Sequence, residues 1–211
     1  MNTLKSGDLI IFQGNSITSK LIQFFTNSKY NHSALVYKCP VSKQLYLFET
    51  GILKEKELVI SKENCTNYSR LVFLKNKTNN PHLAKLYVRR LKNKNNTKIT
   101  DLEWSLVITK NLGKKYDDCI IQYWNERTKA SLIDLPFLDG LSENENSWSC
   151  AELVFSILNE VGILHIQPWA LKKKKQVNPN DLFLLPNNGY DWCPLINDFY
   201  YDPPELFYSA K

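Results

Sequence analysis

The chain has 211 residues, of which 43% are hydrophobic, and carries a formal net charge of +6 with a pI near 8.9. This length is enough for one well-buried core and short for two ordinary domains, so we expect a single domain, residues 1–211. The lysines are scattered among asparagines rather than gathered on one helix face, which disfavours nucleic-acid binding. No apolar run is long enough to cross a membrane, so we expect no transmembrane segment.

The cysteines narrow the function classes further. They are odd in number, widely spaced and free of any CxxC pair: Cys39, Cys65, Cys119, Cys150 and Cys193. This pattern disfavours zinc binding and dithiol redox chemistry and favours free thiols in a reducing compartment. The first eight residues lack the apolar core of a signal peptide, so we expect a cytoplasmic protein.

The first half of the chain predicts mainly β structure. Residues 9–12 predict a short buried strand, and residues 16–25 have the apolar spacing of a short amphipathic helix. Two apolar stretches, 32–37 and 44–49, flank a turn near Pro40 and predict an antiparallel hairpin. Further strands are expected at 57–60 and 70–74.

The middle of the chain predicts helices separated by polar loops. Asn80-Pro81 precedes apolar residues at helical spacing, which predicts a helix through Leu91. Residues 93–97 predict a solvated loop. A capping-box pattern of Thr100 and Glu103 then opens a helix that ends near Gly113, and residues 128–147 show no helical periodicity.

The clearest helix in the sequence follows Ser149. Ser149 and Glu152 repeat the capping-box pattern, and apolar residues continue at helical spacing until Gly162. A last strand is expected at 181–185, before an aromatic and proline-rich tail. The predicted fold is therefore α+β, with an antiparallel sheet packed against the cysteine-bearing helix.

Cys150 is the candidate nucleophile because it falls at the first position of that helix. Unpaired backbone N–H groups and the positive end of the helix dipole stabilise a thiolate there, and they lower a cysteine pKa. The same N–H groups can stabilise the oxyanion of an acyl intermediate. The position of Cys150 at the helix N-terminus thus favours both the thiolate nucleophile and the oxyanion intermediate.

A cysteine nucleophile needs a base, and His32 is the best placed of the three histidines. His82 follows a predicted helix start and His165 lies between apolar residues, whereas His32 opens a strand directly after a polar segment. If the hairpin turn is centred near residue 41, position 32 pairs with about position 50. Glu49 is then placed to orient His32, with Thr50 as the fallback.

Several motifs resemble the permuted papain-like branch of the NlpC superfamily, especially its YiiX-like and poxviral members. They are Gly7-Asp8-Leu9-Ile10, Tyr30-Asn31-His32-Ser33-Ala34-Leu35-Val36, Phe48-Glu49, Gly113-Lys114-Lys115-Tyr116-Asp117, Ser149-Cys150-Ala151-Glu152-Leu153-Val154 and Pro179-Asn180-Asp181-Leu182. Their order places histidine before acid, tyrosine and cysteine, which is the permuted order. Ala151 departs from the pattern, because many relatives carry serine there.

The resemblance implies a circularly permuted papain-like fold and a Cys-His-Glu hydrolase that needs no metal or cofactor. It also implies that Tyr116 positions the substrate carbonyl or the oxyanion. Related sites cleave peptide bonds or move acyl chains on lipids, so the expected substrate is a peptide, an amide or an acyl lipid. With the asparagine- and lysine-rich composition, the resemblance favours a viral or host-associated source, and hence the host cytoplasm or a virion.

Each candidate residue also has an ordinary structural explanation. Cys150 could be an inert buried thiol, His32 a strand-end histidine and Glu49 a hairpin surface charge. Glu152 is explained as the capping partner of Ser149, and 172–175 as a solvated lysine run. The function we predict is amide or peptide hydrolysis. The alternatives are a lipid-directed thiol acyltransferase or phospholipase, and a catalytically silent module that binds lipid or protein.

Overall fold

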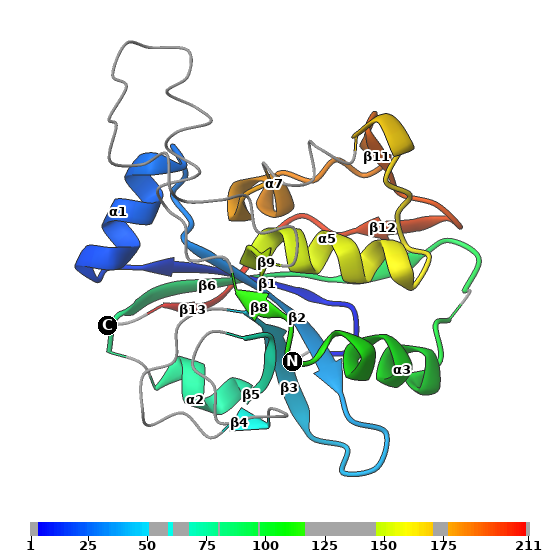
Figure 1. The fold of residues 1–211 in the computed structure, drawn as a ribbon, viewed down its shortest axis with the longest axis horizontal. Coiled ribbons are helices and arrows are strands. Elements are labelled where there is room, and N and C mark those ends of the chain that lie inside the picture. The colour runs from blue at the N-terminus through cyan, green and yellow to red at the C-terminus, as the bar shows by residue number, and fades with distance from the viewer. Residues whose placement is uncertain are drawn as a thin grey trace.

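A computed structural model of the chain describes residues 4–50, 59–60, 68–79, 81–96, 98–116, 147–170 and 177–209. Its main feature is a seven-stranded antiparallel sheet with the strand order β13-β6-β1-β2-β3-β5-β4. Helix α5 packs on β2 and contacts α3 and α7 (Figure 1). This mixed architecture confirms the α+β class.

The strands at the centre of the sheet are buried on both faces. In β1 (Leu9–Gly14), Leu9 and Ile11 belong to the apolar cluster that includes α5. Ile10 and Phe12 point to a second cluster on the opposite face. A strand covered on both faces needs no polar alternation, which explains the continuous apolar run.

The predicted hairpin is present as β2 (His32–Lys38) and β3 (Leu45–Glu49). The two strands pair in register, with Leu35 opposite Phe48. On the far side of β3 lies β5 (Arg70–Phe73), followed by the short helix α2 (Leu74–Thr78) and flanked by β4 (Val59–Ile60). The expected strand at 57–60 is confirmed only for its last two residues, because 57 and 58 lie outside the described part.

The helix expected after Asn80-Pro81 is wrong. This region forms β6 (Leu83–Arg89) and β7 (Leu91–Asn93), with β6 between β1 and β13. The register shifts between Gln13 and Gly14, so that Leu83 pairs with Gly14 while Lys85 pairs with Gln13. Such a bulge places residues three apart on the same face of a strand, which reproduces helical spacing in the sequence.

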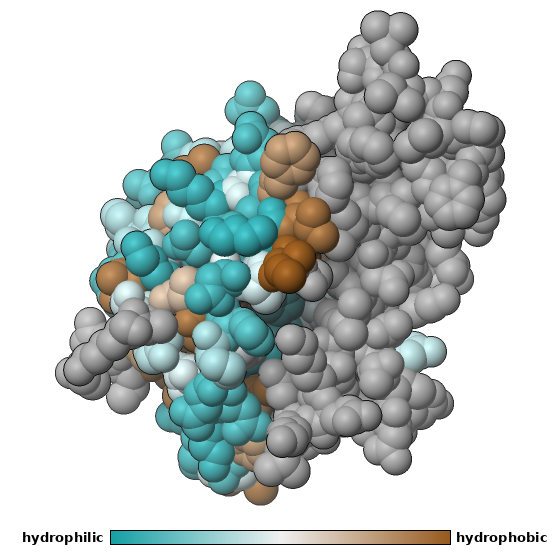
Figure 2. All heavy atoms as spheres, turned by 90° about the vertical axis from the view of Figure 1, so that its left-hand side faces the viewer, coloured by the Kyte–Doolittle hydropathy of each residue, from teal (hydrophilic) through white to brown (hydrophobic). Residues whose placement is uncertain are grey.

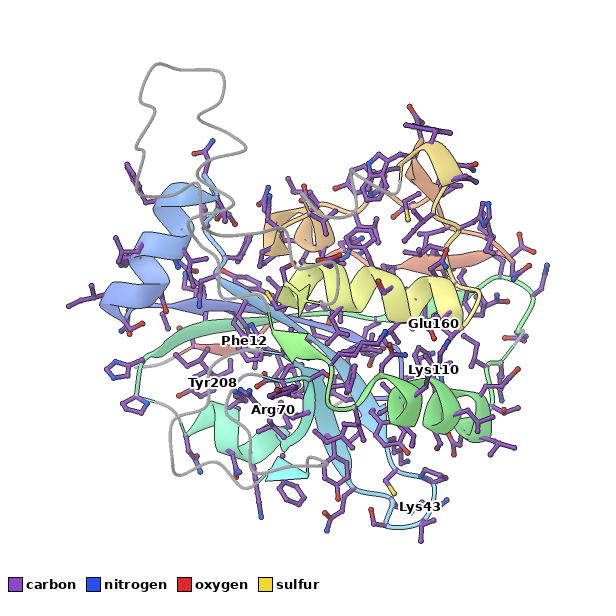
Figure 3. All side chains as sticks on the ribbon, viewed as in Figure 1. Phe12, Lys43, Arg70, Lys110, Glu160 and Tyr208 are labelled. Atoms are coloured by element: carbon purple, nitrogen blue, oxygen red, sulfur yellow. The ribbon has the colours of Figure 1, made fainter. Side chains whose placement is uncertain are left out.

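The other predicted helices are present. Ser16 caps α1 (Ile17–Phe25), and capping boxes open α3 (Asp101–Asn111) and α5 (Cys150–Glu160). Lys110 of α3 and Glu160 of α5 form an ion pair at 2.9 Å, and Figure 3 shows these two side chains next to one another. The segment 128–147, in which the sequence shows no helical periodicity, lies outside the described residues except for Ser147, and so does the lysine run at 172–175.

The strand expected at 181–185 is also wrong, because α7 (Pro179–Phe183) occupies most of that range. The Asn178 side chain accepts a hydrogen bond from Asn180 N–H, and Asp181 accepts one from Asn178 N–H. Pro179 supplies a fixed φ at the first helical position. These three helix-start signals, within four residues, favour a helix more strongly than the apolar run that follows them favours a strand.

Short elements complete the described chain. They are η1 (Pro168–Ala170), β8 (Lys115–Tyr116), β9 (Ser147–Trp148), β10 (Gly189–Tyr190), β11 (Cys193–Pro194), β12 (Phe199–Tyr201) and β13 (Glu205–Ser209). Strand β12 pairs with β7, and β13 with β6. Within the described ranges, no helix has the length and apolar character needed to span a membrane.

Candidate active site

Cys150 lies at the N-terminus of α5, as its sequence context predicts. The Ser149 hydroxyl accepts a hydrogen bond from Glu152 N–H at 3.2 Å, and the Glu152 carboxylate accepts one from Ser149 N–H at 3.4 Å. This reciprocal cap fixes the first turn of the helix. The thiol of Cys150 is buried and is not part of a disulfide.

His32, at the start of β2, faces this thiol. Packing of α5 on β2 brings the two residues together, so that the His32 imidazole and the Cys150 thiol shift one another's pKa. The ring of Phe12, the register partner of His32 on β1, lies 5.2 Å away between centroids. The His32 side chain is 20% exposed, whereas Cys150 is buried.

Glu49, the last residue of β3, binds the other side of the imidazole. Its Oε2 lies 2.8 Å from His32 Nε2, which leaves Nδ1 as the ring nitrogen for the thiol. The Thr50 hydroxyl is buried and has no hydrogen-bond partner among the described residues. The geometry therefore selects Glu49 and not Thr50 as the residue that orients His32.

Two cations that the sequence did not indicate hold the second oxygen of Glu49. Arg70 donates to Oε1 at 3.0 Å, and Lys77 lies 2.8 Å from the same atom. The Glu49 side chain is fully buried, and those of Arg70 and Lys77 are 2% and 13% exposed. Figure 3 labels Arg70 in the interior of the protein, far from Lys43 at the tip of the β2–β3 hairpin.

Strand pairing explains how Arg70 reaches this position. Glu49 and Arg70 are register partners in the antiparallel β3–β5 ladder, and Lys77 follows on α2. The sequence does indicate that Arg70 opens an apolar strand. It does not indicate which residue of β3 lies opposite Arg70, because a long segment, and not a tight hairpin turn, connects the two strands.

The charges of the site reinforce one another. Burial, the largest single effect, acts to raise the pKa of Glu49, but the combined attraction of Lys77, His32 and Arg70 holds that pKa well below its ordinary value. Burial likewise acts to lower the pKa of His32, yet Glu49 and Cys150 raise it to about 9. Glu49 is therefore a carboxylate and His32 is protonated at neutral pH.

Cys150 responds to the same charges. Burial acts to raise the pKa of its thiol, but the adjacent imidazole of His32 and its positive charge lower it overall. By contrast, burial alone raises the pKa of Cys193 to about 12. Among the described cysteines, Cys150 is thus the one placed to form a thiolate–imidazolium pair.

The other candidates from the sequence are not all placed in this site. His82 and His165 are exposed, and neither is among the hydrogen-bonding groups that act on Cys150. Tyr116 lies on β8, which pairs in parallel with β9, so its backbone is opposite Trp148 and near the start of α5. Its side chain lies outside what the structure describes. In the described parts, no three His, Cys, Asp or Glu side chains form a metal-binding group.

Comparisons with known proteins add a structural likeness. No family model and no curated protein matches the chain. A solved structure described as the metalloprotein yiiX from Escherichia coli O157:H7, DUF1105, aligns with a TM-score of 0.48 and 16% sequence identity. The alignment covers 95% of this chain and 97% of the other.

Proposed function

We propose that this chain is a cysteine hydrolase of the circularly permuted papain-like type. It acts as an amidase or peptidase through Cys150, His32 and Glu49 and forms an acyl-enzyme. The observation that carries the proposal is the position of His32, whose imidazole is hydrogen-bonded to the Glu49 carboxylate and lies close enough to the Cys150 thiol for each to shift the pKa of the other. This chain of contacts has the nucleophile, base and orienting group in the order that thiol catalysis requires.

In the first step the Cys150 thiolate attacks the carbonyl carbon of an amide, and a C–S bond forms. The protonated His32 then gives its proton to the leaving nitrogen as the C–N bond breaks. By helix geometry, the N–H groups of Cys150 and Ala151 have no acceptor within α5, so they can stabilise the oxyanion. The resemblance assigns Tyr116 to the same oxygen.

In the second step water resolves the acyl-enzyme. Neutral His32 takes a proton from water, and the water oxygen attacks the thioester carbon. The C–S bond breaks, the carboxylic acid leaves, and the thiolate–imidazolium pair is restored. Glu49 keeps the imidazole in one orientation through both steps and stabilises its protonated form.

The silent binding module is the less favoured alternative. It predicts a thiol directed into the apolar core or a histidine beyond contact distance, whereas His32 is near enough to lower the pKa of Cys150. A buried Glu49 with two cationic partners is also a costly arrangement for a site with no electrostatic task. The lipid-directed acyltransferase shares the first chemical step, so substrate selectivity separates it from an amidase.

The pH dependence of alkylation by iodoacetamide, followed by peptide mapping, tests the activated thiol. We expect Cys150 to react well below the pH of an ordinary thiol and to lose this advantage in His32→Ala. Cys39 is the internal control, because hydrogen bonds at Ser42, and not His32, lower its thiol pKa. Amide and acyl-ester libraries then identify the bond that is cleaved.

The proposal fails if Cys150 reacts no faster than an ordinary buried thiol, or if His32→Ala leaves its rate unchanged. It also fails if alkylation shows an activated thiol but no amide or peptide is cleaved while acyl esters are. That second result supports the lipid-directed alternative.

A further inference from the structure

Helix α1 exposes three large apolar side chains. Ile17, Leu21 and Phe24 are 83%, 47% and 78% exposed. At about 100° per residue, these three positions fall within roughly 60° of one another, so they form a single stripe. Figure 2 views the side of the molecule that carries α1 and shows apolar side chains gathered in a stripe beside hydrophilic ones.

A polar contact attaches the opposite side of α1 to the sheet, because Gln23 Nε2 donates to the Gly14 carbonyl of β1 at 3.0 Å. On the same side the buried Ser19 hydroxyl pairs with that of Ser16, the cap residue of the helix, at 2.8 Å. An ordinary surface helix packs its apolar side inward and exposes its polar side. In α1 the three most exposed apolar side chains lie instead on the side that faces away from these polar contacts.

The chain segment that carries the stripe has only positive charges. Lys20 lies one helical turn before Phe24 on the same side of α1, and Lys29 follows the helix. Both lysines are exposed. No aspartate or glutamate occurs between Leu9 and Phe48. An exposed apolar helix face next to lysines, in a chain segment that contains no acidic residue, has the chemistry of a helix that lies in the interface of an anionic bilayer.

We propose that α1 is a membrane-docking element, which inserts Ile17, Leu21 and Phe24 among the acyl chains of an anionic lipid surface while Lys20 and Lys29 contact the headgroups. The stripe is a ridge about 10 Å long, from one helix of nine residues. Such a narrow convex ridge is too small for a stable protein interface, which takes about 800 Å² from each partner. It is well suited to insertion between lipids.

Docking through α1 would orient the candidate active site. Strand β1 leads into α1, and β2, which follows, begins with His32. The Asn31 side chain accepts a hydrogen bond from Gly14 N–H at 2.5 Å, which ties the two ends of the α1 segment together beside His32. This consequence for acyl-lipid substrates rests on the proposed function, whereas membrane binding itself does not.

Cosedimentation with vesicles tests the proposal. The wild-type chain should bind vesicles of phosphatidylcholine and phosphatidylserine, and bind pure phosphatidylcholine more weakly. Ile17→Gln with Phe24→Gln should reduce binding by about tenfold or more, because two apolar side chains no longer enter the bilayer. Lys20→Gln with Lys29→Gln should reduce binding to the anionic vesicles towards that seen with phosphatidylcholine alone.

The matched control uses another pair of exposed apolar residues. Leu102 and Leu106 on α3 are 67% and 62% exposed, but they lie beside Asp101 and Glu103. Leu102→Gln with Leu106→Gln should leave vesicle binding unchanged. Cys150→Ser should also bind like wild type, which separates docking from thiol chemistry.

Three results would overturn the proposal. The first is no binding to either kind of vesicle. The second is a lowered melting temperature in Ile17→Gln with Phe24→Gln together with unchanged binding, which would mean that the stripe packs within the chain. The third is a concentration-dependent dimer, seen by sedimentation velocity and lost in the same variant, with no lipid binding; the stripe would then contact a second copy.

Discussion

Glu49 and Arg70 lie opposite each other in the β3–β5 ladder, and their side chains are joined by a 3.0 Å hydrogen bond on the side of the carboxylate away from His32. The carboxylate is therefore held from both ends, by a cation on Oε1 and by the imidazole on Oε2. Because the sheet register sets one of these contacts, the orientation of His32 depends on the sheet as well as on α5.

Glu49→Gln should lower the free energy of unfolding by about 3–5 kcal/mol at pH 7, because two buried cations lose their carboxylate. The pKa of Glu49 is held below its ordinary value of 4.5, so its stabilising contribution is present above that pH and is lost as the pH falls. Urea unfolding of both proteins at a series of pH values should show the difference narrowing below about pH 4.5.

Glu103→Gln serves as the control for that experiment. Glu103 is an exposed carboxylate in the capping box of α3, remote from any buried cation pair. Its substitution should change the unfolding free energy far less. Equal losses for the two variants would contradict the role assigned to the buried carboxylate.

Lys77→Met should slow the alkylation of Cys150 at pH 7, because Glu49 loses one of the contacts that hold it against His32. A loss of about 1 kcal/mol in this positioning corresponds to a rate about fivefold lower. Lys75→Met is the matched control on the same short helix, since Lys75 lies over the Phe73 ring and forms no ion pair with Glu49. A purely structural effect would lower stability without changing the reactivity of the native thiol.

Ser149→Ala should cost about 1 kcal/mol of stability through loss of the α5 cap. It should also slow Cys150 alkylation, because the cap fixes the helix turn whose N–H groups favour the thiolate. Thr100→Ala removes the same kind of cap from α3 at a similar cost in stability. Urea unfolding and alkylation rates together check that only the first variant affects the thiol.

The pH profiles of cleavage and alkylation should differ on the alkaline side. Cleavage needs a protonated His32 to supply the leaving group, so its rate should fall as the pH passes the His32 pKa of about 9. Alkylation needs only the thiolate and should not fall there. Parallel profiles for the two reactions above pH 9 would contradict the assignment of His32 as the proton donor.

The sequence predicted those parts of the site that depend on local signals. The capping box placed Cys150 at the start of a helix, and hairpin pairing placed Glu49 beside His32, as the 2.8 Å contact shows. Arg70 and Lys77 could not be predicted in the same way. Their contact with Glu49 depends on the pairing of strands that are distant in the sequence.

The two wrong elements have different causes. In β6 a bulge imitated helical spacing, and burial on both faces removed the polar alternation that would have indicated a strand. At α7 the apolar residues were given more weight than the Asn178 cap and Pro179. The strand β6 could be recognised only from its tertiary contacts, whereas local signals were sufficient to predict the helix α7.

The position of β13 has a consequence for biosynthesis. Strand β6 pairs with β1 on one side, but its other partner begins at Glu205, 116 residues after β6 ends at Arg89. At 5–20 residues per second, a ribosome needs roughly 6 to 23 s to add that stretch. Until then the nascent sheet ends in the open backbone of β6, a site where other chains can pair. Chaperone contact during translation is therefore expected to concentrate on this strand.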